Sequence, residues 1–345
     1  MKPIILQGHS RPIKDIKFNK DGDFIFTASS DRLITLWASE TGERIGTFEH
    51  SAAINNITLT QDSKILISGD NTGISYFWEI STGKLLKKIE TEPYFSVRSC
   101  DLSFGDKMIA ISFGGRVKDS DSFVHVYNVE DVLKADTNKD MAITRLQPIR
   151  EFKSKTSKFV KAKWINTNKN LVCCKEDGSI CMLDYETKEI VREAKIHSDV
   201  IQDMDVSKNE EVILTASKDG KAQVIDPDTF NIMHTLHPND PTRNLNSCKI
   251  SPLFSANDEN TEKFHALLAG GQESRDVTTT HSKKGGFELL FYNVMYGEEL
   301  GALQGHFGPV NTVAFSPDGT LIASGAEDST VRIHKLDDEY FALDK

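Results

Sequence analysis

A histidine, a serine and an aspartate near the start of the chain are the residue types of a hydrolytic triad. They are His9, Ser29 and Asp31, and Trp37 follows shortly after them. In a triad of this kind the histidine takes the serine proton while the aspartate orients the histidine. One short segment therefore offers a candidate nucleophile, base and orienting acid.

The same residue types return twice further along the chain. The second set is His197, Ser217 and Asp219. The third set keeps His306 and Asp328 but has Ala326 where the serine is expected. A catalytic site occurs once in a chain, whereas this set recurs and loses members. We therefore interpret it as a structural hydrogen-bond network that pairs buried polar groups and fixes a turn.

Long segments that start at Leu6 and Leu303 indicate which elements position these residues. Each segment contains a Gly-His pair, a strand pattern, an Asp-Gly turn and two further strand patterns. Alternating apolar and polar residues mark strands, and pairs such as Asp21-Gly22 and Asp318-Gly319 mark tight hairpins. The sequence thus predicts a repeated all-β unit.

One position in the third strand of each expected unit repeats along the whole chain. It is occupied in turn by Trp37, Trp78, Tyr127, Leu183, Ile225, Tyr292 and His334. An aspartate precedes it by six residues in five units, and Thr72 and Gly286 replace this aspartate in the second and sixth units. Units of about 40–45 residues are typical of WD repeats, and the chain resembles the WD-repeat family over almost its whole length. This resemblance implies an all-β, seven-bladed β-propeller that forms a single domain over residues 1–345.

The two chain ends are expected to meet in the last blade. The final unit shows three strand patterns before the chain ends in DDEYFALDK, and residues 2–6 form an unassigned strand pattern before Gly8. A propeller blade is a four-stranded sheet. We therefore predict that the N-terminal strand is the outer strand of the last blade.

Composition and charge argue against several function classes. The net charge of −10 disfavours binding to phosphate backbones or to an anionic membrane surface. The five cysteines include no CxxC pair, so we expect neither a metal site nor a disulfide framework, and no cofactor. The innermost strand patterns, such as IKDIKF, show no repeated acidic or histidine position that would suit a propeller hydrolase. We therefore expect a cytoplasmic binding scaffold that is not an enzyme.

Three irregular segments are candidates for contact with partners. Residues 113–123 and 270–287 both lie between expected second and third strands, and they supply Arg116, Gln272 and Arg275 as candidate partner-binding residues. Loops on a rigid scaffold often carry function, and the alternative is that these two segments are neutral insertions. Residues 152–164 contain five lysines, which form either an RNA-binding or acid-binding patch or a solvated loop face.

The segment GGQESRDVTTTHSKKGGFELLFYN and the opening MKPIILQGHSRPIKDIKFNKDGD sharpen the resemblance. Both are similar to the WD-repeat i subunits of eukaryotic translation initiation factor 3, and the match is collinear through the chain. This resemblance implies a non-catalytic subunit that binds the b and g subunits and reaches the small ribosomal subunit through the complex. No sequence-specific nucleic-acid contact, membrane contact or homo-oligomer is expected. A receptor-associated signalling adaptor or a ubiquitin-ligase adaptor stays the alternative.

The resemblance also places a docking helix of the b subunit near the fifth and sixth units. Val224 and Asp226 end a strand there and lie on the same face by alternation. We expect Val224 in the buried centre of that interface and Asp226 as its specificity contact. The alternative is that Asp226 is only the aspartate of a WD dipeptide.

Overall fold

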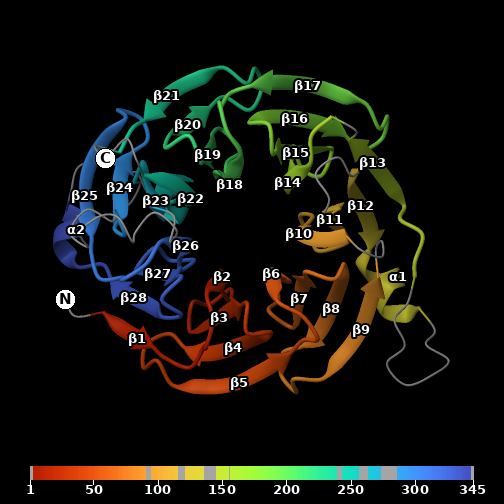
Figure 1. Cartoon of the computed structure of the whole chain (residues 1–345), viewed down its shortest axis with the longest axis horizontal. Helices are drawn as coiled ribbons and strands as arrows, with labels where there is room; N and C mark the ends of the chain where they lie inside the picture. The colour runs from red at the N-terminus through yellow and green to blue at the C-terminus, as the bar shows by residue number, and fades with distance from the viewer. Residues whose placement is uncertain are drawn as a thin grey trace. The chain divides into compact units, whose positions relative to one another are not determined.

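The computed structural model describes residues 3–90, 95–115, 121–135, 145–154, 156–238, 243–255, 263–272 and 286–342. Its strands form seven four-stranded sheets, which are the blades of a seven-bladed β-propeller (Figure 1). Neighbouring strands in the described part of these sheets pair in the antiparallel direction, as expected for hairpin-connected strands. The predicted fold class is confirmed.

The blades are numbered in chain order. Blade 1 contains β2 (Ile13–Phe18), β3 (Phe24–Ser29), β4 (Leu33–Ala38) and β5 (Arg44–Glu49). Blade 2 contains β6 (Ile54–Leu59), β7 (Ile65–Asp70), β8 (Ile74–Glu79) and β9 (Leu85–Glu90). Blade 3 contains β10 (Phe95–Leu102), β11 (Met108–Gly115), β12 (Ser122–Asn128) and β13 (Arg150–Ser154). Blade 4 contains β14 (Phe159–Ile165), β15 (Asn170–Lys175), β16 (Ser179–Asp184) and β17 (Ile190–Lys195).

The remaining blades follow the same order. Blade 5 contains β18 (Ile201–Val206), β19 (Ile213–Ser217), β20 (Ala222–Ile225) and β21 (Ile232–Leu236). Blade 6 contains β22 (Asn244–Ile250), β23 (His265–Gly271), β24 (Leu289–Asn293) and β25 (Glu298–Leu303). Blade 7 contains β26 (Val310–Phe315), β27 (Leu321–Ala326), β28 (Val331–Lys335) and β1 (Ile4–Leu6). The helices are α1 (Val129–Lys134), the 3₁₀ turn η1 (Pro252–Ser255) and α2 (Asp338–Ala342).

Contacts divide the chain into two compact units. The first comprises residues 1–27, 36–45 and 196–345, and the second comprises residues 28–35 and 46–195. Every contact between blades that is described below lies within one of these units. The single-domain organisation stays a prediction. No helix in the described part of the chain combines the length and apolar composition that a membrane crossing needs.

The N-terminal strand completes blade 7, as predicted. In β1, Ile4 lies opposite Ile333 and Leu6 lies opposite Val331 of β28. Leu6 is buried in a cluster that also contains Trp37 and Val331. The last blade is therefore assembled from both ends of the chain.

The repeated third-strand position has one register in the sheets. Trp78 lies opposite Leu66, Tyr127 opposite Ile109, Leu183 opposite Leu171, Ile225 opposite Ile213, Tyr292 opposite Ala266 and His334 opposite Ile322. Within each compact unit, the side chain packs toward the outer strand of the preceding blade. Trp78, for example, meets Phe48 of β5 edge to face, with ring centroids 5.6 Å apart. These aromatic side chains therefore join one blade to the one before it.

Polar side chains on the innermost strands join neighbouring blades, which corrects one expectation. Asn56 accepts the Cys100 N–H at 2.7 Å, and Asp203 accepts the Cys248 N–H at 3.2 Å. Asp15 has the same place in IKDIKF that Asp203 has in IQDMDV, so an acidic position is repeated. Both carboxylates are buried, because they accept hydrogen bonds inside the protein instead of facing solvent.

Candidate functional site

The triad-like residues of blade 1 surround a threonine that the sequence analysis did not single out. The Trp37 indole N–H donates to Thr27 Oγ1 at 2.9 Å, and His9 Nε2 lies 2.8 Å from the same oxygen. Thr27 has no exposed surface. One hydroxyl therefore connects the imidazole with the indole in the interior of the blade.

The same hydroxyl position is used in three further blades. Trp78 donates to Ser68, whose hydroxyl lies 3.0 Å from His50 Nε2. In blades 5 and 7 the corresponding pairs are His197 with Thr215 at 2.9 Å and His306 with Ser324 at 2.8 Å. The histidine and hydroxyl thus recur as a unit in blades 1, 2, 5 and 7.

The expected serines, Ser29 and Ser217, have a different role, and this corrects the sequence analysis. Each hydroxyl accepts the backbone N–H of the turn aspartate two residues on, at 3.1 Å from Asp31 and 3.2 Å from Asp219. Residues two apart in a strand point to the same side, so residue types alone did not separate Ser29 from Thr27. Ala326 in blade 7 removes only this turn contact.

The turn aspartates complete the network in blades 5 and 7. His197 Nδ1 lies 3.0 Å from Asp219, and His306 Nδ1 lies 3.0 Å from Asp328. Burial would raise the pKa of Asp328, but hydrogen bonds from His306 and from the Phe307 N–H outweigh burial and hold that pKa well below its usual range. Burial lowers the pKa of His197 despite the attraction of Asp219.

This arrangement has the order of a catalytic triad but not its accessibility. The hydroxyls of Thr215 and Ser324 belong to side chains with no exposed surface. A nucleophile must come within bonding reach of a substrate atom. The network therefore satisfies buried polar groups and fixes the turn before the third strand.

Blade 2 keeps the turn although Thr72 stands where the aspartate is expected. Asp70 replaces it from two residues upstream, accepting the Thr72 N–H at 2.8 Å and the Ile74 N–H at 3.1 Å. The turn is therefore fixed by a carboxylate from another position, which spacing alone did not indicate.

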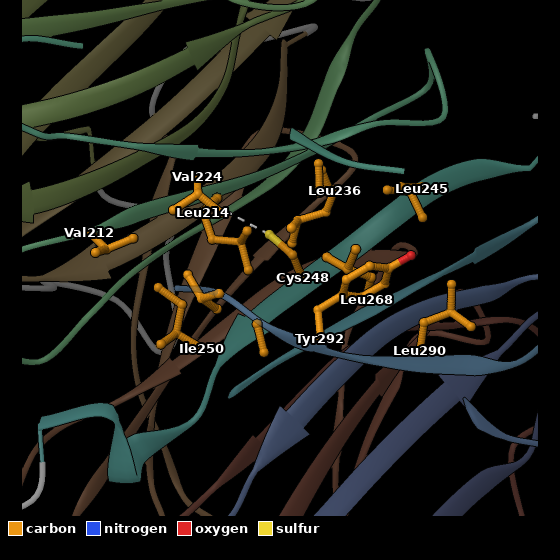
Figure 2. Packing of buried hydrophobic residues seen from close by; sticks show 14 of the residues in the cluster. Val212, Leu214, Val224, Leu236, Leu245, Cys248, Ile250, Leu268, Leu290 and Tyr292 are labelled. Atoms are coloured by element: carbon orange, nitrogen blue, oxygen red, sulfur yellow. Dashed lines mark hydrogen bonds between the residues drawn. The ribbon is translucent and has the colours of Figure 1, made fainter. Parts of the chain in front are cut away.

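The structure contradicts the expected role of Val224. Its side chain is only 1% exposed and lies among Leu214, Cys248 and other apolar residues of blades 5 and 6 (Figure 2). The reason is that β20 is an inner strand of its sheet, between β19 and β21. Neighbouring blades cover such a strand, so Val224 belongs to the core and has no surface to offer a partner.

Asp226 lies at the surface but is engaged in a turn. Its carboxylate accepts the Asp228 N–H at 2.8 Å and the Thr229 hydroxyl at 2.9 Å. The corresponding Asp184 of blade 4 accepts backbone N–H groups in the same way, at 2.7 and 2.8 Å. The repeat indicates a structural role in the hairpin between the third and fourth strands.

Four exposed apolar side chains lie next to this hairpin, and the sequence patterns did not indicate them. They are Ile232 and Met233 of β21, which are 46 and 44% exposed, and Met295 and Tyr296 of the turn after β24, which are 40 and 70% exposed. The turn lies against β21, because a Cβ on Gly297 would be 3.6 Å from the His234 ring. We call these four residues the blade 5–6 flank.

The other candidate partner residues have mixed outcomes. Arg116 and Arg275 lie outside the described residues. Gln272 follows β23 and is half-buried, so the expanded segment does lie between the second and third strands of blade 6.

Two lysines of the lysine-rich segment are engaged within the structure, and Lys155 lies outside the described residues. Lys158 is buried and donates to the Gly115 carbonyl at 3.0 Å, and Lys153 pairs with Asp121. Most of the segment belongs to β13 and β14.

All five cysteines are buried free thiols. Cys173 and Cys181 lie opposite each other in β15 and β16, and burial raises the pKa of Cys173. A buried thiol of raised pKa is a poor nucleophile. These residues therefore act as small apolar core groups.

Seven four-stranded blades with a recurrent histidine, hydroxyl and turn aspartate define a WD-repeat type of β-propeller. The family model described as EIF3I matches residues 1–345, and the chain belongs to that family. It is similar to proteins named eukaryotic translation initiation factor 3 subunit I. The protein of Xenopus tropicalis is 35% identical over 342 residues, which cover 99% of this chain and 98% of the relative. The Homo sapiens protein is 34% identical over 345 residues, which cover 100% of this chain and 99% of the relative.

Proposed function

We propose that this chain is a non-catalytic scaffold subunit of eukaryotic translation initiation factor 3 in the cytoplasm. The observation that carries the proposal is the match of the EIF3I family over all 345 residues. Relatives with the subunit I name align along their whole length as well. The b and g subunits are the proposed direct partners, and the small ribosomal subunit is reached through the complex.

The interior of the blades supports a scaffold role. The residues that resemble a triad form hydrogen bonds within their own blades, and the side chains that carry the hydroxyl groups are buried.

The blade 5–6 flank is the proposed site for a helix of the b subunit. Ile232, Met233, Met295 and Tyr296 supply an exposed apolar surface of the kind that an amphipathic helix covers. Asp226 and Asp228 of the neighbouring hairpin add negative charge at one end of it. An apolar stripe with a basic edge on the helix complements this combination.

The test is binding of a peptide from the C-terminal region of the b subunit to Tyr296→Ser and Asp226→Lys variants. Tyrosine is a frequent hot-spot residue in interfaces, so Tyr296→Ser should lower the affinity for the peptide by about tenfold or more. Phe307→Ser is the matched control, because Phe307 is 85% exposed and precedes blade 7, where the corresponding residues of blades 1, 2 and 5 are serines.

Unchanged affinity of Tyr296→Ser, with Asp226→Lys also unchanged, would remove the helix from this flank. The wider proposal is tested separately by tagging the full chain and identifying co-purified proteins. Recovery of receptors or ligase subunits without initiation-factor subunits would contradict the scaffold role in translation.

A further inference from the structure

Blade 7 has the smallest aromatic ring at the repeated third-strand position. His334 stands where Trp37 and Trp78 stand in blades 1 and 2. In those blades the indole covers an apolar residue on the outer strand of the preceding blade. Leu6 beside Trp37 is 2% exposed, and Phe48 beside Trp78 is 3% exposed.

The corresponding outer-strand residue next to His334 is less completely covered. Leu303 of β25 is only partly buried. Its counterparts Ile89, Phe152 and Leu236 in blades 2, 3 and 5 are all buried, with at most 4% exposed. The imidazole therefore leaves open apolar surface of blade 6, whereas Tyr127, Leu183 and Tyr292 cover the corresponding residues in other blades.

Blade 7 also lacks the hairpin that follows the third strand in blades 1, 2, 4, 5 and 6. Its outer strand β1 comes from the start of the chain, so the chain after β28 continues into α2 instead of turning back. Tyr340 of α2 packs on Phe291 and lies 3.1 Å from His265 Nδ1 through its hydroxyl. Tyr340 fills only part of the space beside β25.

The result is a cavity of about 270 Å³ between blades 6 and 7. Its lining residues are Phe291, Leu300, Gly301, Ala302, Leu303, His334, Lys335, Leu336, Asp337 and Tyr340. The walls are mainly apolar, and burial lowers the pKa of His334 to about 4, so the imidazole is neutral at pH 7. We call this space the blade 6–7 cavity.

The size of the cavity selects the kind of occupant. An apolar cavity of about 150 Å³ is enough for benzene, whereas sites for drug-sized molecules and cofactors take about 300–1,000 Å³. A volume of 270 Å³ fits one large aromatic side chain. Its imidazole floor can accept a hydrogen bond from an indole N–H, which favours tryptophan over phenylalanine.

The charges around the cavity indicate which residues should flank this side chain in the partner. Asp337 and Lys335 stand at the cavity itself, and Glu298 and Glu339 are exposed within two residues of its lining. Carboxylates therefore outnumber ammonium groups among the described residues at and next to the lining, which makes the mouth of the cavity acidic. Basic residues next to the aromatic side chain complement that mouth.

We propose that the blade 6–7 cavity receives a tryptophan side chain from a lysine- or arginine-bearing segment of a partner protein. The tryptophan covers Leu303 and Phe291 from outside the chain, as Trp37 covers Leu6 from within it. This surface is separate from the blade 5–6 flank, and it does not depend on the identity of the complex.

The test uses three probes and the full-length chain. The probes are a short peptide with one tryptophan between lysines, the same peptide with alanine in place of tryptophan, and N-acetyltryptophanamide. Fluorine NMR of 5-fluorotryptophan in the first and third probes reports binding, and an unlabelled competition measures the alanine peptide. We expect the tryptophan peptide to bind about tenfold or more tightly than the alanine peptide.

Two variants fill the cavity independently. His334→Trp replaces the missing indole, and Gly301→Leu adds a side chain on the same face of β25 as Leu303, where a Cβ meets no atom within 4 Å. Each should abolish binding of the tryptophan peptide while the protein stays folded. Gly301→Leu keeps the test valid even if His334→Trp is misfolded, because its side chain enters open space.

A third variant separates a partner segment from a small molecule. Asp337→Lys should lower the affinity for the tryptophan peptide several-fold at low salt and leave the affinity for N-acetyltryptophanamide unchanged. Equal affinity for the peptide and for N-acetyltryptophanamide would overturn the partner segment in favour of a small-molecule site. Absence of binding to the unaltered chain, or binding that survives both filling variants, would overturn the cavity as the site.

Discussion

Replacing His50 by leucine should make the protein less sensitive to acid. His50 of blade 2 lies between Tyr76 and Trp78, with ring centroids 4.0 and 5.6 Å away. Burial is the main cause that lowers its pKa to about 3, and the nearby Lys88 adds to the effect. The folded protein therefore holds His50 neutral, whereas the unfolded chain protonates it below its usual pKa of about 6.5.

The sign and size of the effect follow from this difference. Because the pKa is lower in the folded state, the unfolded state binds more protons in acid, and stability is lost as pH falls from 6.5 toward 3. The loss from His50 alone is about 0.8 kcal/mol at pH 6 and about 2 kcal/mol at pH 5. Above pH 7.5 the group contributes almost no pH dependence.

The measurement is urea unfolding of the unaltered chain and of His50→Leu at pH 7.5, 6 and 5. The stability difference between the two proteins should change by about 2 kcal/mol in favour of the variant between pH 7.5 and 5. His265 and His334, whose pKa values burial lowers to about 4, titrate in both proteins and cancel in the comparison. Parallel pH curves for the two proteins would refute the argument.

Two further predictions concern the architecture of the blades. Deleting residues 1–6 removes β1 and the buried Leu6, so stability should fall by about 3–5 kcal/mol in thermal or urea unfolding; an unchanged melting temperature would contradict the pairing with β28. Thr215→Val leaves His197 Nε2 without its hydroxyl partner and should cost about 1–3 kcal/mol, more than Ser217→Ala; the opposite order would contradict the assignment of Thr215 to the network.

The strand pattern was predictable from sequence because the residues that form the turns between strands lie close to those strands in the chain. The Asp-Gly pairs that end the first strands adopt the required backbone, with Gly22 at φ 78° and Gly319 at φ 74°. The pairing of residues near both chain ends was also predictable, since blade 7 lacked one strand and the N-terminus supplied an unassigned one. Counting strands per blade was enough for that inference.

The surface was less predictable, because exposure in a propeller depends on neighbouring blades. Alternation placed Val224 and Asp226 on one face, but β20 is an inner strand of its sheet and residues of blade 6 pack on Val224, so this side chain does not reach solvent. Asp203 was missed for a similar reason: its role depends on a backbone N–H of the next blade, which spacing within one unit does not reveal.

The pairing of β1 with β28 also has a consequence for the newly made chain, because β28 is synthesised long after β1. Leu6 and its partner Val331 are about 325 residues apart, so the ribosome needs roughly 15 to 65 seconds between making the first and the second. During this interval β1 has no partner strand, while the blades made in between already have all four of theirs. A chain released early by a truncated message would keep an unpaired N-terminal strand, a feature that invites association with other chains. Blade 7 can therefore be completed only after translation has passed β28.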